Sequence, residues 1–435
     1  MNYQKIEGNE YDIHIINNKK FHTINCRICF TENSNKKLIT YRNVLINILT
    51  CATKKYDTKE KLIKVCQDLY SLSPVALTVR NGNLQTTKFS ISTINSSYIS
   101  ENNLIDNLLL LKEIVLNPLV SNNRFSSKYF KITKKELEVE TKTISEEPRL
   151  YANIELLKII DKDNQLSTGY SDLDTLNEIN EENLYQSYLD MVNNSKIDIF
   201  ISGNIKNSKK IVKIIQENFK FNKNNVKLKD ALINYHDTSE LITKRETKNY
   251  QQSKLSVGYK LYNLTDYENR YVSFVFNNML GGGANSLLMR YIREEKSLCY
   301  YINSYNNRLD NIMIINSGIK KENYKIVLES INKTIDDIID GKFTLKDLKE
   351  SKMEVLYNLS NIFESNRSII EYYYGQSILN STDINTKVKM IKKISKKDII
   401  DYAKKLNIEG IFFLEGDLWL SISILEKNKI SIMKN

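Results

Sequence analysis

The sequence predicts an α+β protein made of two homologous halves, each an antiparallel β-sheet with helices packed on it. Three observations lead to this prediction. The chain has 435 residues, which is too long for one compact core. Two pairs of similar segments recur at nearly the same spacing. Short strands and longer amphipathic helices occur without the strict alternation that is typical of a parallel doubly wound sheet.

The first pair of similar segments consists of two apolar strands that each end near a glycine. IDIFISGNI spans residues 197–205, and IFFLEGD spans residues 411–417. Their glycines, Gly203 and Gly416, are 416 − 203 = 213 residues apart. A glycine at this place permits a tight exit from a buried strand. We therefore expect the two strands to occupy equivalent places in the two halves.

The second pair of similar segments joins an apolar helix to a charged helix through a short break. One copy begins at residue 108 and the other at residue 326. Phe125 and Phe343 occupy comparable places in them, 343 − 125 = 218 residues apart. The nearly equal offsets of the two pairs predict two homologous halves of roughly 210 residues.

The boundary between the halves is predicted from composition. Residues 222–246 are polar and only weakly periodic, which is typical of a linker. We therefore expect an N-terminal domain over residues 1–221 and a C-terminal domain over residues 247–435. Alternating patterns predict strands such as those at 253–262 and 312–320 within the second half.

Composition excludes several classes of protein. A hydrophobic content of 41% supports a folded core and argues against global disorder. No apolar run reaches the about 18 residues of a transmembrane helix, so we expect no membrane span. The N-terminus shows no basic head followed by an apolar stretch, so no secretion signal is expected. Five cysteines in a long chain fit reduced thiols, so we expect a cytoplasmic protein.

The net charge of +11 leaves room for an anionic partner. Lysines are dispersed among acidic residues rather than clustered, which argues against a nucleic-acid interface. A basic wall that faces an acidic substrate is the stronger alternative. A nucleic-acid-binding protein would show tight, strongly salt-dependent binding, which a gel-shift assay at two salt concentrations would detect.

The segment LGGGANSLLMRYIREEKSLCYY, residues 280–301, has the least ordinary pattern in the chain. It lacks the GxxxxGK[ST] or GxGxxG spacing of a phosphate-binding loop, so a nucleotide site is not predicted. Asn285 and Ser286 are good N-cap residues, so a helix is expected to begin there. Arg293 then falls in its last turn, and a strand begins at Cys299.

From residue types alone, this segment has two interpretations. In the structural one, the glycines make a turn, Arg293 complements the helix C-terminus, and Tyr300 packs in a sheet. In the functional one, the arginine and the tyrosine face a ligand. A guanidinium and a phenol can both donate hydrogen bonds to a substrate carbonyl or to the oxyanion that forms from it.

The segment resembles a pattern in the C-terminal half of the M16 (insulinase/mitochondrial processing peptidase-like) metallopeptidase family. In that family a Gly-rich loop precedes a helix, an arginine and then a tyrosine seven residues later, and Arg293 and Tyr300 match this spacing. The two halves, the LNPL segment at 116–119 and the chain length agree with the M16B-type two-domain members. The resemblance implies LuxS/metallopeptidase-like domains. It also implies substrate-binding roles for Arg293, Tyr300 and the loop Gly281, Gly282 and Gly283.

Active members of the family carry HxxEH in the N-terminal half, where two histidines bind zinc and the glutamate acts as general base. The only histidines of this chain are His14, His22 and His236, and none has that spacing. The resemblance places NVLIN there, so Asn43 and Asn47 stand in the ligand positions and Ile46 in the position of the base.

The family's further glutamate ligand corresponds to Glu140 in this alignment. Its separation from Asn47, 140 − 47 = 93, is longer than usual in the family, and one carboxylate alone does not hold zinc. No metal and no cofactor are therefore expected in this chain.

A second possible metal site lies at HTINCRIC, which supplies His22, Cys26 and Cys29. A CxxC pair can chelate zinc. This stretch alternates like a strand, however, and residues three apart in a strand point to opposite faces. Buried thiols are therefore the simpler interpretation.

The resemblance implies a subunit that is not an enzyme on its own. A heterodimeric partner with HxxEH would supply zinc and the general base, and the pair would cleave or mature a peptide. This chain would bind the substrate through Arg293 and Tyr300. The alternative is a structural or peptide-binding scaffold of M16 fold with no proteolytic role.

Overall fold

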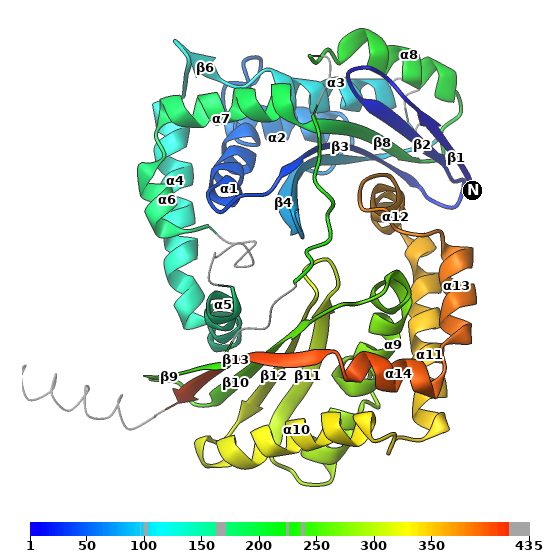
Figure 1. Cartoon of the computed structure of the whole chain (residues 1–435). Coiled ribbons are helices and arrows are strands. Elements are labelled where there is room, and N and C mark those ends of the chain that lie inside the picture. Colours follow the sequence, from blue (N-terminus) through cyan, green and yellow to red (C-terminus); the bar gives the residue numbers. More distant parts are fainter. Residues whose placement is uncertain (96, 100–102, 162–170, 223–225, 236–239, 417–435) are drawn as a thin grey trace, which may run out of the picture. The chain divides into compact units, whose positions relative to one another are not determined.

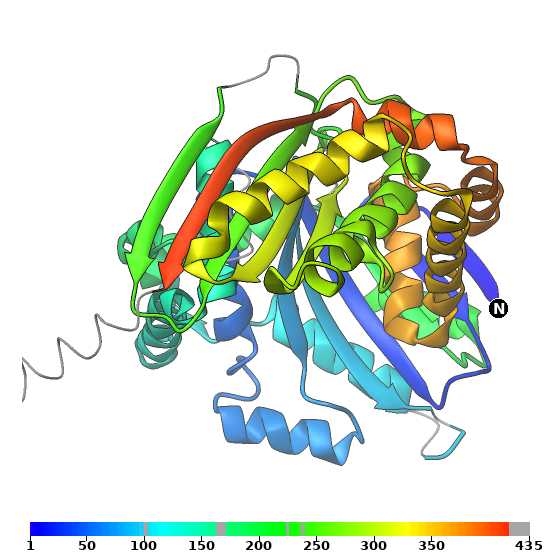
Figure 2. The ribbon, with the colours of Figure 1, turned by 90° about the horizontal axis from the view of Figure 1, so that it is seen from below.

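A computed structural model describes residues 1–95, 97–99, 103–161, 171–222, 226–235 and 240–416. The chain forms two compact units, and each contains one large β-sheet (Figures 1 and 2). Unit 1 comprises described residues of 1–142, 168–231 and 362–380. Unit 2 comprises those of 143–167, 232–361 and 381–435.

The chain passes between the units more often than a single linker requires. One crossing lies between Ala231 and Leu232, inside the segment predicted as a linker. In addition, residues 143–167 of the first half belong to unit 2, and residues 362–380 of the second half belong to unit 1. The two structural units are therefore not continuous stretches of sequence. The division into domains at residues 222–246 stays a prediction.

Unit 1 is built on a six-stranded sheet of order β1-β2-β8-β3-β5-β4. Its neighbouring strands are antiparallel except for the parallel pair β2 and β8. The strands are β1 (Asn2–Ile6), β2 (Asp12–Asn17), β3 (Thr23–Asn33), β4 (Val75–Asn81), β5 (Leu84–Ile94) and β8 (Lys196–Gly203). A separate short hairpin is formed by β6 (Val120–Ser121) and β7 (Arg124–Phe125).

The helices of unit 1 come mostly from the first half of the chain. They are α1 (Leu38–Leu49), α2 (Lys59–Asp68), α3 (Asn103–Leu116), α4 (Ser127–Thr143), α6 (Leu173–Glu178), α7 (Glu181–Asn194), α8 (Ser208–Asn218) and, from the second half, α12 (Asn366–Ile378). On β8, the alternate residues Ile197, Ile199 and Ile201 enter the main core with α1, α3 and α7. Phe200 points to the other face, where it packs with Ile370 of α12.

Unit 2 is built on a five-stranded sheet of order β11-β12-β10-β13-β9. Here the parallel pair is β13 and β9, and the other neighbours are antiparallel. The strands are β9 (Ile242–Lys248), β10 (Ser253–Leu261), β11 (Cys299–Asn307), β12 (Ile312–Ile319) and β13 (Leu406–Gly416). Both sheets are thus mainly antiparallel, as predicted, with one parallel pair in each that the local pattern does not show.

The helices of unit 2 cover both faces of its sheet. They are α5 (Pro148–Ile160), α9 (Ser273–Asn277), α10 (Tyr324–Ile339), α11 (Leu345–Ser360), α13 (Ile384–Lys393) and α14 (Lys396–Ala403). Three π-helical stretches are η2 (Glu268–Val272), η3 (Asn278–Gly282) and η4 (Met289–Glu294), and three 3₁₀ turns are η1 (Ile144–Glu146), η5 (Lys321–Asn323) and η6 (Asn361–Glu364), the last at the boundary between the units.

The two sheets share one strand order, which confirms two halves of similar fold. In unit 1 the last strand, β8, pairs in parallel with β2 and antiparallel with β3. In unit 2 the last strand, β13, pairs in parallel with β9 and antiparallel with β10. The remaining strands then follow in the same order in both units: β5 and then β4 in unit 1, and β12 and then β11 in unit 2. Strand β1 is an additional edge strand of unit 1. A parallel pair requires a long crossover connection, which the intervening helices supply in each half.

The repeated glycines end these equivalent strands, as predicted. A Cβ atom on Gly203 would lie 2.7 Å from the carbonyl oxygen of Thr23, where β3 begins. A Cβ atom on Gly416 would lie 2.5 Å from the carbonyl oxygen of Tyr250, shortly before β10. In both units the backbone that enters the neighbouring strand passes too close for any side chain, which explains why glycine recurs at this place.

Residues 143–167 and 362–380, which belong to the unit formed mainly by the other half of the chain, each supply a helix that covers one face of a sheet. Within unit 2, α5 packs on β10 and β13, and Ala152, Leu156 and Ile160 form a small apolar core with that face. A Cβ atom on Gly410 of β13 would lie 2.4 Å from Cγ2 of Ile160, so this glycine is needed for the close approach of the helix. Within unit 1, α12 packs on β3 and β8 in the same way.

Candidate substrate-binding site and the degenerate zinc-site positions

The Gly-rich segment forms the end of a run of helical residues beside one edge of the unit 2 sheet. The π-helical turn η3 ends at Gly282, and Gly283 has extended backbone angles. A Cβ atom on Gly281 would lie 2.7 Å from the backbone nitrogen of Ser304 on β11. One on Gly283 would lie 2.8 Å from the carbonyl oxygen of Asn278. Packing within the chain therefore demands glycine at these positions, while Gly282 is exposed.

The next helix presents Arg293 to solvent. Helical residues begin at Leu287, close to the predicted caps, and Arg293 lies in the last turn, as predicted. Leu288 and Ile292 are completely buried in the core of unit 2, so Arg293 falls on the outer side of the helix. Its Nη1 lies 3.8 Å from Sδ of Met289, one turn earlier.

Tyr300 lies at the start of the edge strand β11, which begins at Cys299 as predicted. Cys299 pairs with Ile319 and Tyr301 pairs with Gly318, so Tyr300 is the extra residue of a β-bulge. Both Cys299 and Ile302 enter the core of unit 2, which regular alternation would not allow. The Tyr300 side chain is 55% exposed. Bulges of this kind re-aim a side chain at a strand edge.

Arg293 and Tyr300 belong to one short stretch of surface. The turn between them is fixed by hydrogen bonds from Ser297 N to Arg293 O (3.1 Å) and from Leu298 N to Ile292 O (3.0 Å). Burial raises the pKa of the Cys299 thiol, and the positive charge of nearby Arg293 opposes that rise. Arg293 therefore lies near the residue that directly precedes Tyr300, and both side chains offer hydrogen-bond donors to solvent.

Three of the positions aligned with HxxEH share one face of α1. Asn43, Ile46 and Asn47 are half-buried, whereas the intervening residues Val44 and Leu45 are in the core. Asn43 donates a hydrogen bond to the hydroxyl of Ser171 at 3.2 Å, and Asn47 donates one to the backbone oxygen of Asn43 at 3.0 Å. Both amides thus take part in hydrogen bonds within the chain, and amides are poor zinc ligands.

Glu140 lies near the end of α4 with its side chain exposed. Another carboxylate of α4, Glu136, acts on the thiol of Cys51, two residues beyond the end of α1. Burial and Glu136 both raise the pKa of Cys51. The assignment of Glu140 to the family's further ligand position stays a prediction.

All of the HTINCRIC stretch except His22 lies in strand β3, and the stretch contains buried thiols as expected. Cys26 joins the main core of unit 1, whereas Cys29 joins the core on the α12 side of the sheet. The two sulfur atoms thus face away from each other, which precludes joint chelation of one ion. His22 is exposed and lies 2.6 Å from the hydroxyl of Tyr98. His236 falls outside the described residues.

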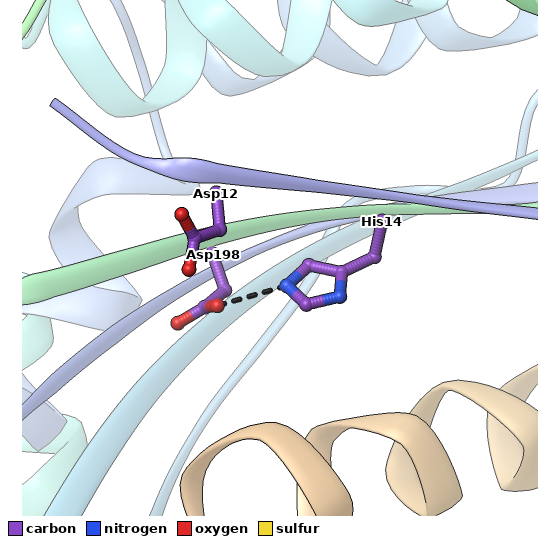
Figure 3. A group of neighbouring side chains, drawn as sticks. All are labelled: Asp12, His14 and Asp198. Carbon is purple, nitrogen blue, oxygen red and sulfur yellow. Dashed lines mark hydrogen bonds and ion pairs between the residues drawn. The ribbon is translucent and has the colours of Figure 1, made fainter. Parts of the chain in front are cut away.

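The structure brings together one group that the sequence did not indicate, Asp12, His14 and Asp198 (Figure 3). These side chains are buried on the neighbouring strands β2 and β8, and their ligand atoms lie within 4.8 Å of one another. His14 and Asp198 are 184 residues apart in sequence. The available local signal was the polar pair Asp12 and His14 among the isoleucines of this strand.

The hydrogen bonds of this group show that its members already have partners. The two ring nitrogens of His14 lie 2.9 Å from Oδ1 of Asp198 and 2.9 Å from the hydroxyl of Tyr3. The carboxylate of Asp12 forms ion pairs with Lys196 at 2.8 Å and Lys5 at 3.1 Å. An ion would have to displace these contacts, so the group is best described as a buried hydrogen-bond network.

The described helices include none with both the length and the apolar character that a membrane span requires.

Comparison with known proteins gives a consistent picture. The model of the Peptidase M16 inactive domain matches residues 178–355. The chain is 23% identical over 411 residues to the "Probable inactive metalloprotease YmfF" of Bacillus subtilis (strain 168), with 93% of this chain and 95% of that protein covered. It is 28% identical over 244 residues to the "Uncharacterized zinc protease YmxG" of the same organism, with 54% of this chain and 58% of that protein covered.

Solved structures show the same fold. A conserved protein from Enterococcus faecalis V583 has a TM-score of 0.87 at 22% identity, with 96% of this chain and 99% of that chain covered. A protease from Helicobacter pylori has a TM-score of 0.79 at 13% identity, with 95% and 99% covered. A peptidase M16 inactive domain from Pseudomonas fluorescens has a TM-score of 0.78 at 14% identity, with 96% and 98% covered. The family model thus identifies a Peptidase M16 inactive domain within residues 178–355, and the chain, whose sequence contains no HxxEH motif, is a homologue of a probable inactive metalloprotease.

Proposed function

We propose that this chain is the non-catalytic, substrate-binding subunit of a heterodimeric M16B-type zinc peptidase. A partner subunit with HxxEH supplies the zinc ion and the general base, and the assembled pair cleaves or matures a peptide. This chain contributes Arg293, Tyr300 and the Gly281–Gly283 segment. The likeness to a probable inactive metalloprotease and to an M16 inactive domain supports the non-catalytic part of the proposal.

The observation that carries the proposal is the exposure of Arg293 and Tyr300 at one end of an edge strand. A guanidinium and a phenol directed to solvent can donate hydrogen bonds to the scissile carbonyl and to the oxyanion formed when water attacks it. A packing role alone does not require a bulge that leaves Tyr300 55% exposed. The neighbouring Cys299 and Ile302 already supply the apolar contacts of this part of the strand.

The edge position of β11 offers a second means of holding a peptide. An edge strand has main-chain N–H and C=O groups that are not used within its own sheet. An extended peptide can add to them, so that main-chain hydrogen bonds give affinity with little demand on sequence. A leader peptide or another short, unfolded peptide is the substrate that fits this arrangement.

The proposal is tested by isolating the full-length chain from its native cells and identifying what co-purifies in equal amount. A partner of similar length with HxxEH is expected, and the complex should cleave a fluorogenic peptide library in a zinc-dependent manner. A chain that elutes alone, or with proteins unrelated to M16, would contradict the heterodimer and favour the alternative, an M16 scaffold with no proteolytic role.

The assembled complex then tests the two residues. Arg293→Ala and Tyr300→Phe are each expected to lower kcat/KM by about 100-fold, since removal of one donor to an oxyanion has an effect of this size. Matched controls on the exposed face of α11 are Lys349→Ala and Tyr357→Phe. Assembly, measured by size-exclusion chromatography, should be unchanged in all four variants. Unaltered turnover in Arg293→Ala and Tyr300→Phe would remove the role assigned to them.

A further inference from the structure

A pocket with two cationic side chains lies in the helical layer of unit 2. Its volume is about 300 Å³, and it is formed by η2, α9, η3, α11 and α13. These helices pack against one another, α11 against both α9 and α13, and α13 against η2 (Figures 1 and 2). A volume of about 300 Å³ lies at the lower end of the range of small-molecule sites.

The lining residues include charged, apolar and amide side chains. Arg270 and Lys387 carry the positive charges, Phe274 and Leu359 are apolar, and Asn277 and Asn358 provide amides. Phe274 is 43% exposed, which is high for an aromatic side chain in a helical layer. An apolar wall with a few convergent polar groups is the usual composition of a site for a small ligand.

Asn277 is held with its amide group beside the pocket. Its Oδ1 accepts a hydrogen bond from the hydroxyl of Ser304 at 2.9 Å. Its Nδ2 would lie 2.5 Å from a Cβ atom on Gly282, and Gly282 itself lines the pocket. Glycine at this position therefore leaves the space that the Asn277 amide occupies, and any side chain there would displace this donor.

The electrostatics of the pocket favour an anion. A third cation, Arg308, lies close enough to act on Lys387. Burial lowers the pKa of Lys387, and the positive charges of Arg308 and Arg270 lower it further. Burial and the charge of Arg270 also lower the pKa of Arg308. Three cations that repel one another in a partly desolvated place are stabilised by a bound negative charge.

Two carboxylates, Asp266 and Asp383, lie near these cations. Asp266 forms an ion pair with Arg270 at 3.3 Å, and its side chain is 80% exposed, so the pair is weakened by solvent. Asp383 is the N-cap of α13 and accepts hydrogen bonds from the backbone and hydroxyl of Thr386. Lys387 itself donates to the hydroxyl of Ser381 at 2.7 Å, a neutral partner.

We propose that this pocket binds a small organic anion, with its phosphate or carboxylate group between Arg270 and Lys387 and its apolar body against Phe274 and Leu359. The site does not depend on the proposed peptidase complex, because unit 2 supplies every residue that forms it. A charged head group gains two charge-assisted contacts, and an aromatic body gains the stacking and apolar contact that a free inorganic ion lacks.

The test is isothermal titration calorimetry on the full chain with four probes: phenyl phosphate, phenylacetate, inorganic phosphate and phenol. We expect phenyl phosphate or phenylacetate, or both, to bind more tightly than inorganic phosphate and phenol. Binding of only one of the two aromatic anions supports the site and identifies its head group. Binding of neither at millimolar concentration, or equal binding of phenol, would overturn the proposal.

Variants assign the binding to this pocket. Lys387→Gln is expected to raise the Kd of the better aromatic anion by about tenfold or more, since a hydrogen bond between charged groups is lost. Lys389→Gln, on the exposed side of the same helix, is the matched control and should leave the Kd within twofold. Equal losses in both variants would indicate non-specific attraction to positive charge and would contradict the site.

A misfolded variant is excluded by thermal unfolding without ligand. Lys387→Gln removes a cation that its neighbours repel, so its Tm should be equal to or higher than that of the unaltered chain. In Phe274→Ala, the aromatic anion should lose its advantage over inorganic phosphate, while phosphate binding itself stays the same. An aromatic anion that keeps its advantage in Phe274→Ala would overturn the assigned position of the apolar body.

Discussion

On α1, the side-chain amide of Asn47 donates a hydrogen bond to the backbone carbonyl of Asn43, one helical turn earlier, over 3.0 Å. Both residues lie with Ile46 on the half-buried face of the helix. Residues at i and i+4 face the same way, so this pair has the geometry that two zinc-binding histidines require but not the chemistry.

Replacing Asn43, Ile46 and Asn47 by the residues of HxxEH tests whether this motif corresponds to residues 43–47. We expect the triple variant Asn43→His, Ile46→Glu and Asn47→His to retain about one zinc ion per chain after dialysis, measured by inductively coupled plasma mass spectrometry. Glu140→Gln in this background should weaken zinc binding if Glu140 is the third ligand. A matched triple variant with Ala at position 46 separates metal binding from the role of the base. A triple variant that retains no zinc would contradict the placement of the motif on α1.

Gly281 is predicted to be needed for packing. Gly281→Ala places a methyl group 2.7 Å from the backbone nitrogen of Ser304 and 2.8 Å from its hydroxyl, so β11 or the helix must shift. Overpacking of this kind should lower the free energy of unfolding by about 1–3 kcal/mol in urea denaturation. Ala284→Gly, at the exposed position three residues later, should change it by less than about 0.5 kcal/mol. If the Gly281→Ala chain is fully stable, packing does not explain the glycine at this position, and contact with a ligand becomes the explanation.

The buried network of Asp198, His14 and Tyr3 should contribute to the stability of unit 1. His14→Ala removes the group that bonds the carboxylate of Asp198, and the free energy of unfolding should fall by at least about 2 kcal/mol. Tyr3→Phe removes one hydroxyl but keeps the stacking on Tyr373, so its effect should be about 1 kcal/mol.

The matched control for this network is His22→Ala. His22 is exposed, and its hydrogen bond to Tyr98 lies at the surface. Its replacement should change the free energy of unfolding by less than about 0.5 kcal/mol. If His14→Ala and His22→Ala have equal effects, the buried network does not stabilise the fold.

Glu371 is predicted to make stability depend on pH. Burial on its own would raise the pKa of this carboxyl, but Lys88 and Arg27 outweigh that effect and hold the pKa below its ordinary value of 4.5. The ion pairs are 2.7 Å and 2.6 Å long and attach α12 to the sheet of unit 1. Because the pKa is depressed in the folded state, the stabilisation is present above pH 4.5 and is lost as pH falls through the folded-state value.

We therefore expect Glu371→Gln to be less stable than the unaltered chain at neutral pH. The difference in unfolding free energy should shrink steadily between about pH 5 and pH 3 in urea titrations. Glu364→Gln is the control, because its ion pair with Lys20 is exposed on both sides and contributes little. A difference for Glu371→Gln that is constant across this pH range would contradict a charge-based role.

Local patterns in the sequence determined much of the fold. Alternation and end signals placed the strand at Cys299 and Arg293 in the last turn of its helix, because these features depend on neighbouring residues. The spacing of Gly203 and Gly416 identified equivalent strands, because each glycine avoids the backbone that enters the next strand. The alternation of β3 likewise placed Cys26 and Cys29 on opposite faces.

Tertiary structure decided which distant segments meet. Helices α5 and α12 each cover a sheet that is formed mainly by the other half of the chain. Amphipathic periodicity shows that a helix has an apolar face, but it does not show which sheet that face packs against. Tyr300 is the extra residue of a bulge, which appears only when β11 is paired with β12. His14 meets Asp198, and Arg270 and Lys387 line the same pocket, through the packing of elements far apart in sequence. Such pairings depend on long-range contacts, and a local pattern of residues carries no record of them.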